Sequence, residues 1–252
     1  MRQIAVYNSK HLGDCILTTH FLRKVCEKYD DICFDFHIGK QYLDRIKLQV
    51  GELSDRISLG VLATTPYEST NMWFAAFPLP KDKGKHRGRW ASNERYDLFH
   101  EVVCEKWEIE NPVPGKCCTV IDLPSLLDPV DVPCDVLVGN SISRSKYYTR
   151  YNAQAFEEKV KEWSKKYNVF TTEPTIEGVP SARELDLNVI QIGHMATKAK
   201  YVVAVDTGTV HNCFNKWALD TVEKWWLLSN KTTRTFNDRI VATNYLHKVD
   251  IP

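Results

Sequence analysis

Short apolar segments that alternate with amphipathic helical patterns constrain the fold of this chain more than any other feature. Residues 4–8 (IAVYN) form the first such segment, and the polar turn SKHLGD follows it. Apolar side chains then recur every four residues from Leu17 to Tyr29, and a second apolar segment follows at 33–39 (CFDFHIG). This order of strand, amphipathic helix and strand predicts a βαβ unit with parallel strands and a right-handed crossover.

The same alternation returns in the second half of the chain. Three apolar segments predict strands, at 134–140 (CDVLVGN), 168–174 (NVFTTEP) and 201–205 (YVVAV). Between the first two, apolar residues at three- and four-residue steps predict a helix that Asn152 caps. Another apolar stripe predicts a helix between the last two. The second half therefore reads as βαβαβ, which predicts a separate parallel sheet.

The region between these two patterns is harder to interpret. Prolines interrupt the stretch 62–133 at eight positions, and no clean period places its elements. We therefore expect two doubly wound domains, at 1–130 and 131–252, joined by a proline-containing linker. Open parallel sheets bind ligands beyond the carboxyl ends of their strands. We expect the loop after the first strand and the loop after 201–205 to face a cleft between the two domains.

Composition excludes several classes of protein. Lys and Arg total 33 against 32 Asp and Glu, so a net charge of +1 gives no overall attraction to nucleic acid, membranes or acidic partners. The eight cysteines include no C-x-x-C pair and mostly lie in apolar segments, which indicates reduced core thiols. The N-terminus lacks the apolar stretch of a signal peptide, and no run approaches the roughly 20 apolar residues that span a bilayer. We expect a soluble, cytoplasmic protein without a transmembrane segment.

The segment VVAVDTGTVHN carries the first motif with chemical content. Asp206 ends an apolar strand, and Thr207, Gly208 and Thr209 follow where a helix is expected to begin. Free backbone N–H groups, two hydroxyls and a glycine that permits close approach predict an anion site, suited to phosphate. The alternative interpretation makes Asp206 a helix N-cap and Gly208 a turn residue.

The segment LGDCILTT carries the second motif, at the corresponding place in the first half. Gly13 and Asp14 lie between the first strand and the first helix. A carboxylate at this position could take a proton from an attacking hydroxyl group, provided that it points into the cleft. Taken alone, the segment fits an N-cap aspartate better.

Together the two motifs resemble a known family. HLGDCILTTHFLRKV and LNVIQIGHMATKAKYVVAVDTGTVHNCF are similar to segments of the bacterial heptosyltransferases, the ADP-heptose:lipopolysaccharide transferases of glycosyltransferase family 9. The resemblance covers most of residues 4–29 and 134–215. It implies the α/β GT-B fold, in which two Rossmann-like parallel-sheet domains face a cleft. The first domain (1–130), here reduced, would bind the acceptor, and the second (131–252) the nucleotide sugar.

The resemblance also implies a reaction and roles for residues. The reaction is a metal-independent, inverting sugar transfer that uses a nucleotide diphosphate sugar as co-substrate and no cofactor. Asp14 would be the general base, with Gly13 beside the acceptor. The donor diphosphate would lie on the C-terminal loop, and the polar segment GNSISRSKYYTRYN (139–152) would supply further donor contacts. The implied donor-binding residues are Ser141, Ser143, Arg144, Lys146, Asp206, Thr207, Gly208 and His211. Two further donor-binding candidates come from the residues themselves: Thr209 in the same loop, and Glu173, which follows the next predicted strand and could bind a donor hydroxyl.

Departures from the family pattern put parts of this inference in question. Thr209-Val210 replaces the usual Pro-Met, NCFNKW follows His211 where the family has small residues, and the chain is short in its first domain. The heptose and the lipopolysaccharide acceptor are the parts least supported by the motifs.

The motifs therefore leave more than one class of acceptor. The segment KDKGKHRGRW (81–90) is expected to form an exposed basic loop, in which Lys83, Lys85 and Arg87 could follow the phosphates of a lipopolysaccharide-type glycan or of DNA. A DNA glycosyltransferase would have to extrude a hydroxymethylated base into the cleft. A solvated loop without function is the simpler interpretation. The motifs are also compatible with a non-catalytic nucleotide- or polyanion-binding protein and with a nucleotide-sugar epimerase or hydrolase.

Overall fold

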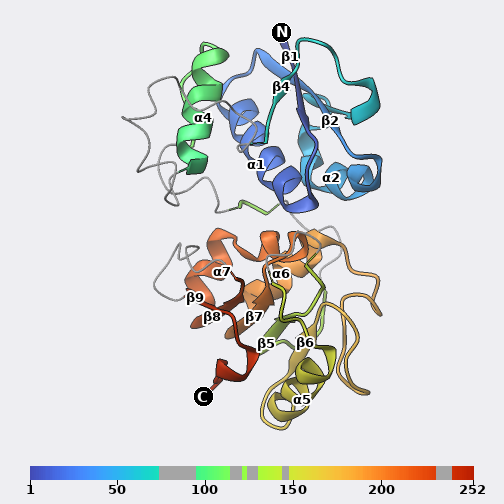
Figure 1. Cartoon of the computed structure of the whole chain (residues 1–252). Helices are drawn as coiled ribbons and strands as arrows, with labels where there is room; N and C mark the ends of the chain where they lie inside the picture. The colour runs from blue at the N-terminus through green and yellow to red at the C-terminus, as the bar shows by residue number, and fades with distance from the viewer. Residues whose placement is uncertain (74–94, 114–120, 124–129, 144–147, 231–239) are drawn as a thin grey trace. The chain divides into compact units, whose positions relative to one another are not determined.

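The chain forms two compact units, Met1–Pro124 and Ser125–Pro252, each described here by itself. The structure, a computed structural model, describes residues 1–73, 95–113, 121–123, 130–143, 148–230 and 240–252, without the side chains of 95–97 (Figure 1). No helix within these ranges is long and apolar enough to cross a membrane.

The described part of the first unit contains a parallel sheet with the strand order β3-β2-β1-β4. Its strands are β1 (Arg2–Asn8), β2 (Ile32–Ile38), β3 (Ile57–Val61) and β4 (Thr70–Asn71). The strands at 4–8 and 33–39 that the sequence predicts are therefore confirmed as β1 and β2, and they pair in parallel.

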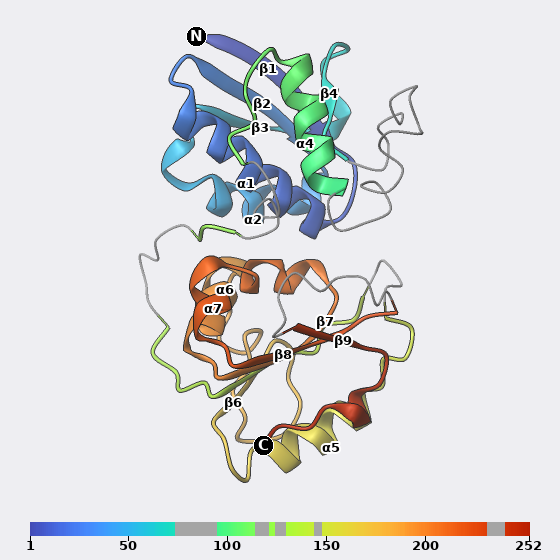
Figure 2. The same cartoon turned by 90° about the vertical axis from the view of Figure 1, so that its left-hand side faces the viewer.

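Three longer helices accompany this sheet in the described residues. They are α1 (Leu12–Lys28), α2 (Leu43–Val50) and α4 (Arg95–Lys106), with short 3-10 helices η1 (Lys40–Tyr42), η2 (Gly51–Leu53) and η3 (Leu62–Thr64). The predicted apolar face of α1 is buried, and α4 lies beside this helix (Figures 1 and 2). The ring of His100 on α4 stacks on Phe21 of α1, with 3.8 Å between ring centroids.

The described part of the second unit contains a parallel sheet with the order β6-β5-β7-β8-β9. Its strands are β5 (Val136–Gly139), β6 (Val169–Thr171), β7 (Tyr201–Val205), β8 (Lys224–Leu228) and β9 (Ile240–Thr243). The three strands predicted in this half are confirmed as β5, β6 and β7. The chain passes from β5 to β6 on one flank of β5, and then crosses back to β7 on the opposite flank of β5. The strand order therefore reverses between β5 and β7, which makes this point a topological switch point.

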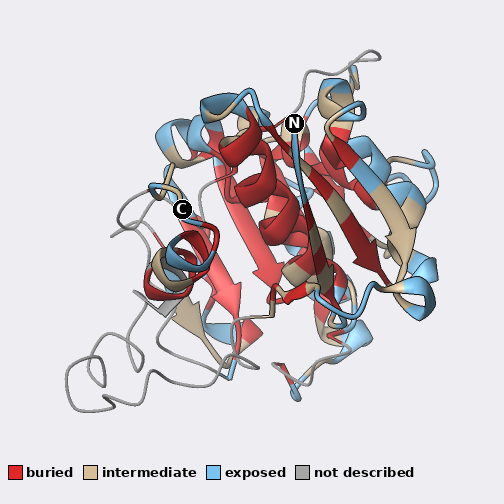
Figure 3. Ribbon diagram, turned by 90° about the horizontal axis from the view of Figure 1, so that it is seen from above, coloured by how far each residue is buried: buried red, intermediate tan, exposed pale blue. Residues whose placement is uncertain are grey.

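Helices cover both faces of this second sheet. They are α5 (Ala153–Trp163), α6 (Val189–Lys198) and α7 (Lys216–Thr221), with 3-10 helices η6 (Gly208–Cys213) and η7 (Leu246–Lys248). Side chains of α6, η6 and α7 pack against Leu137, Val202 and Trp225, whereas α5 and the C-terminal segment pack against the alternate residues of the same strands. Coverage on both faces explains why every residue of β5, β6 and β7 is buried. Figure 3 colours the described residues by burial.

Several details of the predicted elements are corrected. The segment after Asp206 is the six-residue 3-10 helix η6, not the start of an α-helix, and α5 ends at Trp163 although the apolar stripe continues to Tyr167. The Asn152 cap of α5 is confirmed, since its side chain accepts a hydrogen bond from Ala155 N–H. The predicted core thiols are confirmed at Cys15, Cys26, Cys104, Cys134 and Cys213, which are free and buried.

Candidate functional site

Polar residues gather where β5, β6 and β7 end. Asn140 follows β5, Thr172 follows β6, and Asp206 follows β7, and each of these three side chains is at most 3% exposed. Polar groups buried at the carboxyl ends of parallel strands must find hydrogen bonds there. The switch point between β5 and β7 is also where open α/β sheets bind ligands.

The loop after β7 is fixed by Asp206. Its backbone N–H donates to Leu228 O at 3.0 Å, its carboxylate Oδ2 accepts from Ser229 Oγ at 3.0 Å, and its carbonyl accepts from Ser143 Oγ at 3.2 Å. The residue that caps η6 is Thr207, with no side-chain cap bond. The N-cap interpretation of Asp206 is therefore wrong, because its carboxylate faces β8 and not the first turn.

The next residues carry unpaired donors. The Thr207 hydroxyl is buried and has no hydrogen-bond partner among the described residues, and within the same ranges the backbone N–H groups of Gly208 and Thr209 donate to none. His211 Nδ1 lies 2.9 Å from Thr207 O and donates to it when the proton is on Nδ1. The ring thus ties the two ends of this turn together.

Close packing sets the position of η6 over the sheet. A Cβ atom on Gly139, the last residue of β5, would lie 2.5 Å from Val210 Cγ1 and 3.0 Å from Ala204 Cβ. A glycine at this position therefore allows η6 to approach the end of β5. This packing brings the turn at 207–209 to the switch point.

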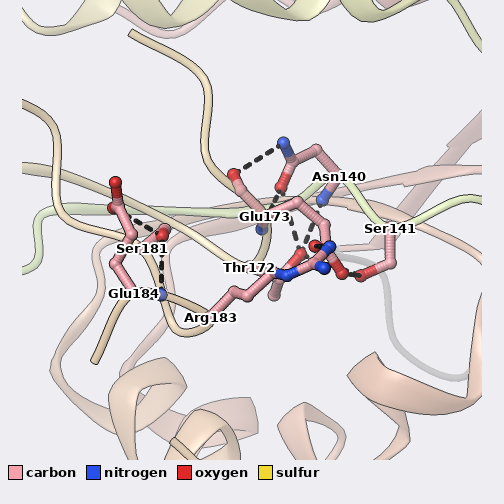
Figure 4. A network of polar contacts seen from close by, with 7 residues as sticks. All are labelled: Asn140, Ser141, Thr172, Glu173, Ser181, Arg183 and Glu184. Atoms are coloured by element: carbon pink, nitrogen blue, oxygen red, sulfur yellow. Dashed lines mark hydrogen bonds and ion pairs between the residues drawn. The ribbon is translucent and has the colours of Figure 1, made fainter. Parts of the chain in front are cut away.

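A second network joins the ends of β5 and β6 (Figure 4). Asn140 Oδ1 accepts from Glu173 N–H at 2.9 Å and from Thr172 Oγ at 3.1 Å, and its Nδ2 donates to Glu173 O at 3.0 Å. These bonds fix the backbone of Glu173. Its carboxylate then accepts from Ser141 Oγ at 3.3 Å and from Arg183 Nη1 at 3.1 Å. The side chains of Arg183 and Glu173 are 75% and 37% exposed, so this ion pair adds little stability and can exchange for another partner.

The structure thus places most of the predicted donor residues on three loops of one sheet. Ser141 and Ser143 follow β5, Glu173 follows β6, and the 206–211 segment follows β7. Arg144 and Lys146 lie outside the described residues, as do Lys83, Lys85 and Arg87. Sequence reasoning missed Asn140, Thr172, Arg183 and Ser229. The signal that could have found three of them was a polar residue directly after an apolar strand.

The first unit places Asp14 differently from its sequence interpretation. The N-cap of α1 is His11, and Asp14 is the third residue of the helix, so the N-cap interpretation of this aspartate is also wrong. Its carboxylate is half-buried and takes part in no hydrogen bond or ion pair with the described residues. Gly13 is buried in the same turn. The backbone here is fixed by Thr18, whose hydroxyl donates to Asp14 O at 2.9 Å and accepts from Asn8 Nδ2 at 3.0 Å.

In the described parts of the chain, no three His, Cys, Asp or Glu side chains gather in a way that could hold a metal ion.

Comparison by sequence finds no family model and no curated protein that matches this chain. Comparison of folds does find similar structures. The Escherichia coli heptosyltransferase WaaC, solved with ADP-2-deoxy-2-fluoro heptose, superposes with a TM-score of 0.53 and 11% sequence identity over 96% of this chain and 93% of WaaC.

A second similar structure is TibC, an iron-containing dodecameric glycosyltransferase of enterotoxigenic E. coli. It has a TM-score of 0.51 and 12% identity over 94% of this chain, which spans 62% of the length of TibC. At such identities the similarity concerns the fold. With two parallel α/β units and these neighbours, the chain has the GT-B-like fold of the heptosyltransferases.

Proposed function

We propose that this protein is a glycosyltransferase that moves a sugar from a nucleotide diphosphate sugar to an acceptor hydroxyl. The observation that carries the proposal is the turn at 207–209, with its unpaired buried hydroxyl and free N–H groups at the switch point of a heptosyltransferase-like fold. Neighbouring donors in one turn that have no acceptor among the described residues suit a bound oxyanion.

The donor diphosphate is assigned to this turn. Thr207 Oγ and the N–H groups of Gly208 and Thr209 would donate to phosphate oxygens, while His211 holds the turn closed through Thr207 O. Charge develops on the diphosphate as it leaves, and nearby cations stabilise it. From the sequence we assign that role to Arg144 and Lys146, rather than to a metal ion.

The nucleoside of the donor is assigned to Glu173. Its backbone is fixed by Asn140, and its carboxylate is partly exposed at the end of β6. A carboxylate accepts hydrogen bonds from sugar hydroxyls. An incoming diol can replace the exposed Arg183 at this carboxylate, since the ion pair between them is weak.

The acceptor half of the reaction is assigned to the first unit. Asp14, whose carboxylate has no partner among the described residues, would take the proton of the acceptor hydroxyl as its oxygen attacks the anomeric carbon. The bond from that carbon to the diphosphate breaks, and the nucleoside diphosphate leaves. Attack opposite the leaving group inverts the anomeric configuration.

The proposed acceptor is a lipopolysaccharide-type glycan. Its support is the resemblance of the two sequence motifs to the ADP-heptose:lipopolysaccharide transferases, together with the fold shared with the heptosyltransferase WaaC. The similar folds are those of heptosyltransferases and glycosyltransferases and give the DNA hypothesis no support. The basic segment that suggested it lies outside the described residues.

The proposal is tested by product analysis. The full-length protein is incubated with a panel of ADP-, GDP-, UDP- and CDP-sugars and with lipopolysaccharide core acceptors truncated to different depths, and the acceptors are examined by mass spectrometry. We expect one donor to add a single sugar to one core structure and to release the nucleoside diphosphate. If the protein binds a nucleoside diphosphate but transfers no sugar to any acceptor, a non-catalytic binding protein is favoured.

A further inference from the structure

Ser229 is a buried residue that lies beside the proposed phosphate turn without belonging to it. It directly follows β8, is fully buried, and donates its hydroxyl to Asp206 Oδ2 at 3.0 Å. The two residues are neighbours across the sheet, because Val205 pairs with Leu228 in the register of β7 and β8. Ser229 N–H also donates to Thr243 O at 3.1 Å, which extends the pairing of β8 with β9 by one residue.

The orientation of the Asp206 carboxylate matters because of its charge. A carboxylate that faced the turn at 207–209 would repel a diphosphate bound there. In the structure this carboxylate is 2% exposed and is directed toward β8. A hydrogen bond to a charged acceptor is among the stronger ones in a protein, and a buried carboxylate depends on such bonds.

We infer that Ser229 is a positioning residue for the donor phosphates, an inference that rests on the proposed function. Its hydroxyl holds the Asp206 carboxylate against β8. This fixes the backbone of Asp206 so that Thr207, Gly208 and Thr209 present their donors to the diphosphate. Ser229 itself does not contact the ligand, so its effect on binding passes through Asp206.

An isosteric pair of substitutions tests the hydroxyl separately from packing. Ser229→Thr keeps the hydroxyl and Ser229→Val removes it, while both add a similar bulk to a fully buried position. Binding of ADP, GDP, UDP and CDP is measured by calorimetry on the full chain. For the diphosphate that binds, we expect Ser229→Val to weaken affinity about 10-fold relative to Ser229→Thr. Equal affinities of the two variants would overturn the inference.

A double-mutant cycle tests the route through Asp206. Ser229→Ala alone is expected to weaken diphosphate binding about 10-fold, but to have no further effect in an Asp206→Ala background. Additive losses in the double mutant would contradict action through the carboxylate.

Ser181→Ala serves as the matched control. Ser181 is fully buried in the same unit and donates to the carboxylate of Glu184, not to that of Asp206, at 2.6 Å. We expect this variant to lose stability but to keep wild-type affinity. An equal loss of affinity in Ser181→Ala would show that the loss in the Ser229 variants comes from general destabilisation of the unit, and it would contradict the inference. If the wild-type protein binds none of the diphosphates, the proposed function fails together with this inference, whereas failure of the variants alone leaves that function intact.

Discussion

Asp14 and Asp206 follow the first strand of one sheet and a central strand of the other, yet their surroundings differ. Asp206 is buried, and its carboxylate accepts a hydrogen bond from Ser229. Asp14 is half-buried in the first turn of α1, and its carboxylate has no partner in the described parts of the chain. This difference is why the proposal assigns the general base to Asp14 and not to Asp206.

The proposed role of Asp14 predicts the effect of Asp14→Asn. Asparagine keeps the size of the side chain but removes the basic group, so turnover is expected to fall about 100-fold or more if proton transfer limits the rate. Diphosphate affinity measured by calorimetry is expected to stay at the wild-type value.

Asp44→Asn provides the control for this experiment. Asp44 is an exposed acidic residue in the first turn of α2, so its substitution removes a similar favourable charge from a helix N-terminus in the same unit. It should leave turnover unchanged. Near-wild-type turnover in Asp14→Asn, or an equal loss in Asp44→Asn, would contradict the role of Asp14 as base.

At the residue scale, the sequence identified the ends of the strands but not the direction of each side chain. It predicted that Asp206 and Asp14 lie after strands, and both do. It could not show that Ser229 lies opposite Asp206, because that contact depends on the pairing of β7 with β8. Asn140 was missed for a related reason: its bonds reach Glu173, which follows β6 about 30 residues later in the chain and comes near only in the folded sheet.

At the element scale, α4 is held against the rest of the first unit by buried rings. His100 stacks on Phe21 of α1, and Trp107 contacts Phe34 and donates its indole N–H to Thr70 Oγ at 3.3 Å. Burial lowers the pKa of His100 to about 3, and the nearby His20 lowers it further. Burial also lowers the pKa of His20 to about 4, opposed by Asp122 and assisted by Lys24 and Arg23.

These two histidines predict an acid-sensitive packing of α4. Both histidines are neutral in the folded state, because their folded pKa values lie below the unfolded pKa of about 6.5. Their contribution to stability is therefore complete above about pH 6.5 and is lost as pH falls toward their folded pKa values. For each histidine, this loss would lower the free energy of unfolding by on the order of 2 kcal/mol at about pH 5. Hydrogen exchange of the α4 backbone, corrected for intrinsic rates, is expected to be faster at about pH 5 than at neutral pH.

His100→Phe separates the titration from the ring packing. Phenylalanine can stack on Phe21 without taking up a proton, so α4 should lose less protection at low pH than in the wild-type protein. His247→Gln, at an exposed histidine of the other unit, is the control and should change nothing in α4. An unchanged pH response in His100→Phe would show that His100 does not govern the acid sensitivity.

The elements that the sequence failed to place share physical causes. β4 has two residues, too few for any period, and α4 lies in the proline-interrupted region where packing on Phe21 and Phe34 supports the helix. The segment after Asp206 carries the signals of a helix start, yet it forms a 3-10 helix whose Val210 packs on Gly139. Tertiary packing thus decided α4 and the segment after Asp206, whereas β4 was too short to be recognised.

At the scale of the whole molecule, the parallel fold was predictable because short apolar segments alternate with amphipathic helical patterns in both halves of the chain. The order of the strands was not. β8 and β9 were absent from the predicted βαβαβ pattern, although they complete the second sheet beside β7. The resemblance carried by two motifs predicted the GT-B-like architecture that fold comparison then confirmed. The residues of the site remain predictions, since no ligand contact tests them.

The proposed function depends above all on the binding of a nucleotide diphosphate at the turn 207–209. Amide NMR spectra of the full chain, recorded during titration with ADP, GDP, UDP and CDP, locate that binding residue by residue. For the diphosphate that binds, we expect the largest shifts at the amides of Thr207, Gly208 and Thr209, with smaller shifts at Glu173. The matching nucleoside without phosphates should leave the turn unaffected. Saturable binding that moves other loops and leaves these three amides in place would contradict the assignment of the phosphates to this turn.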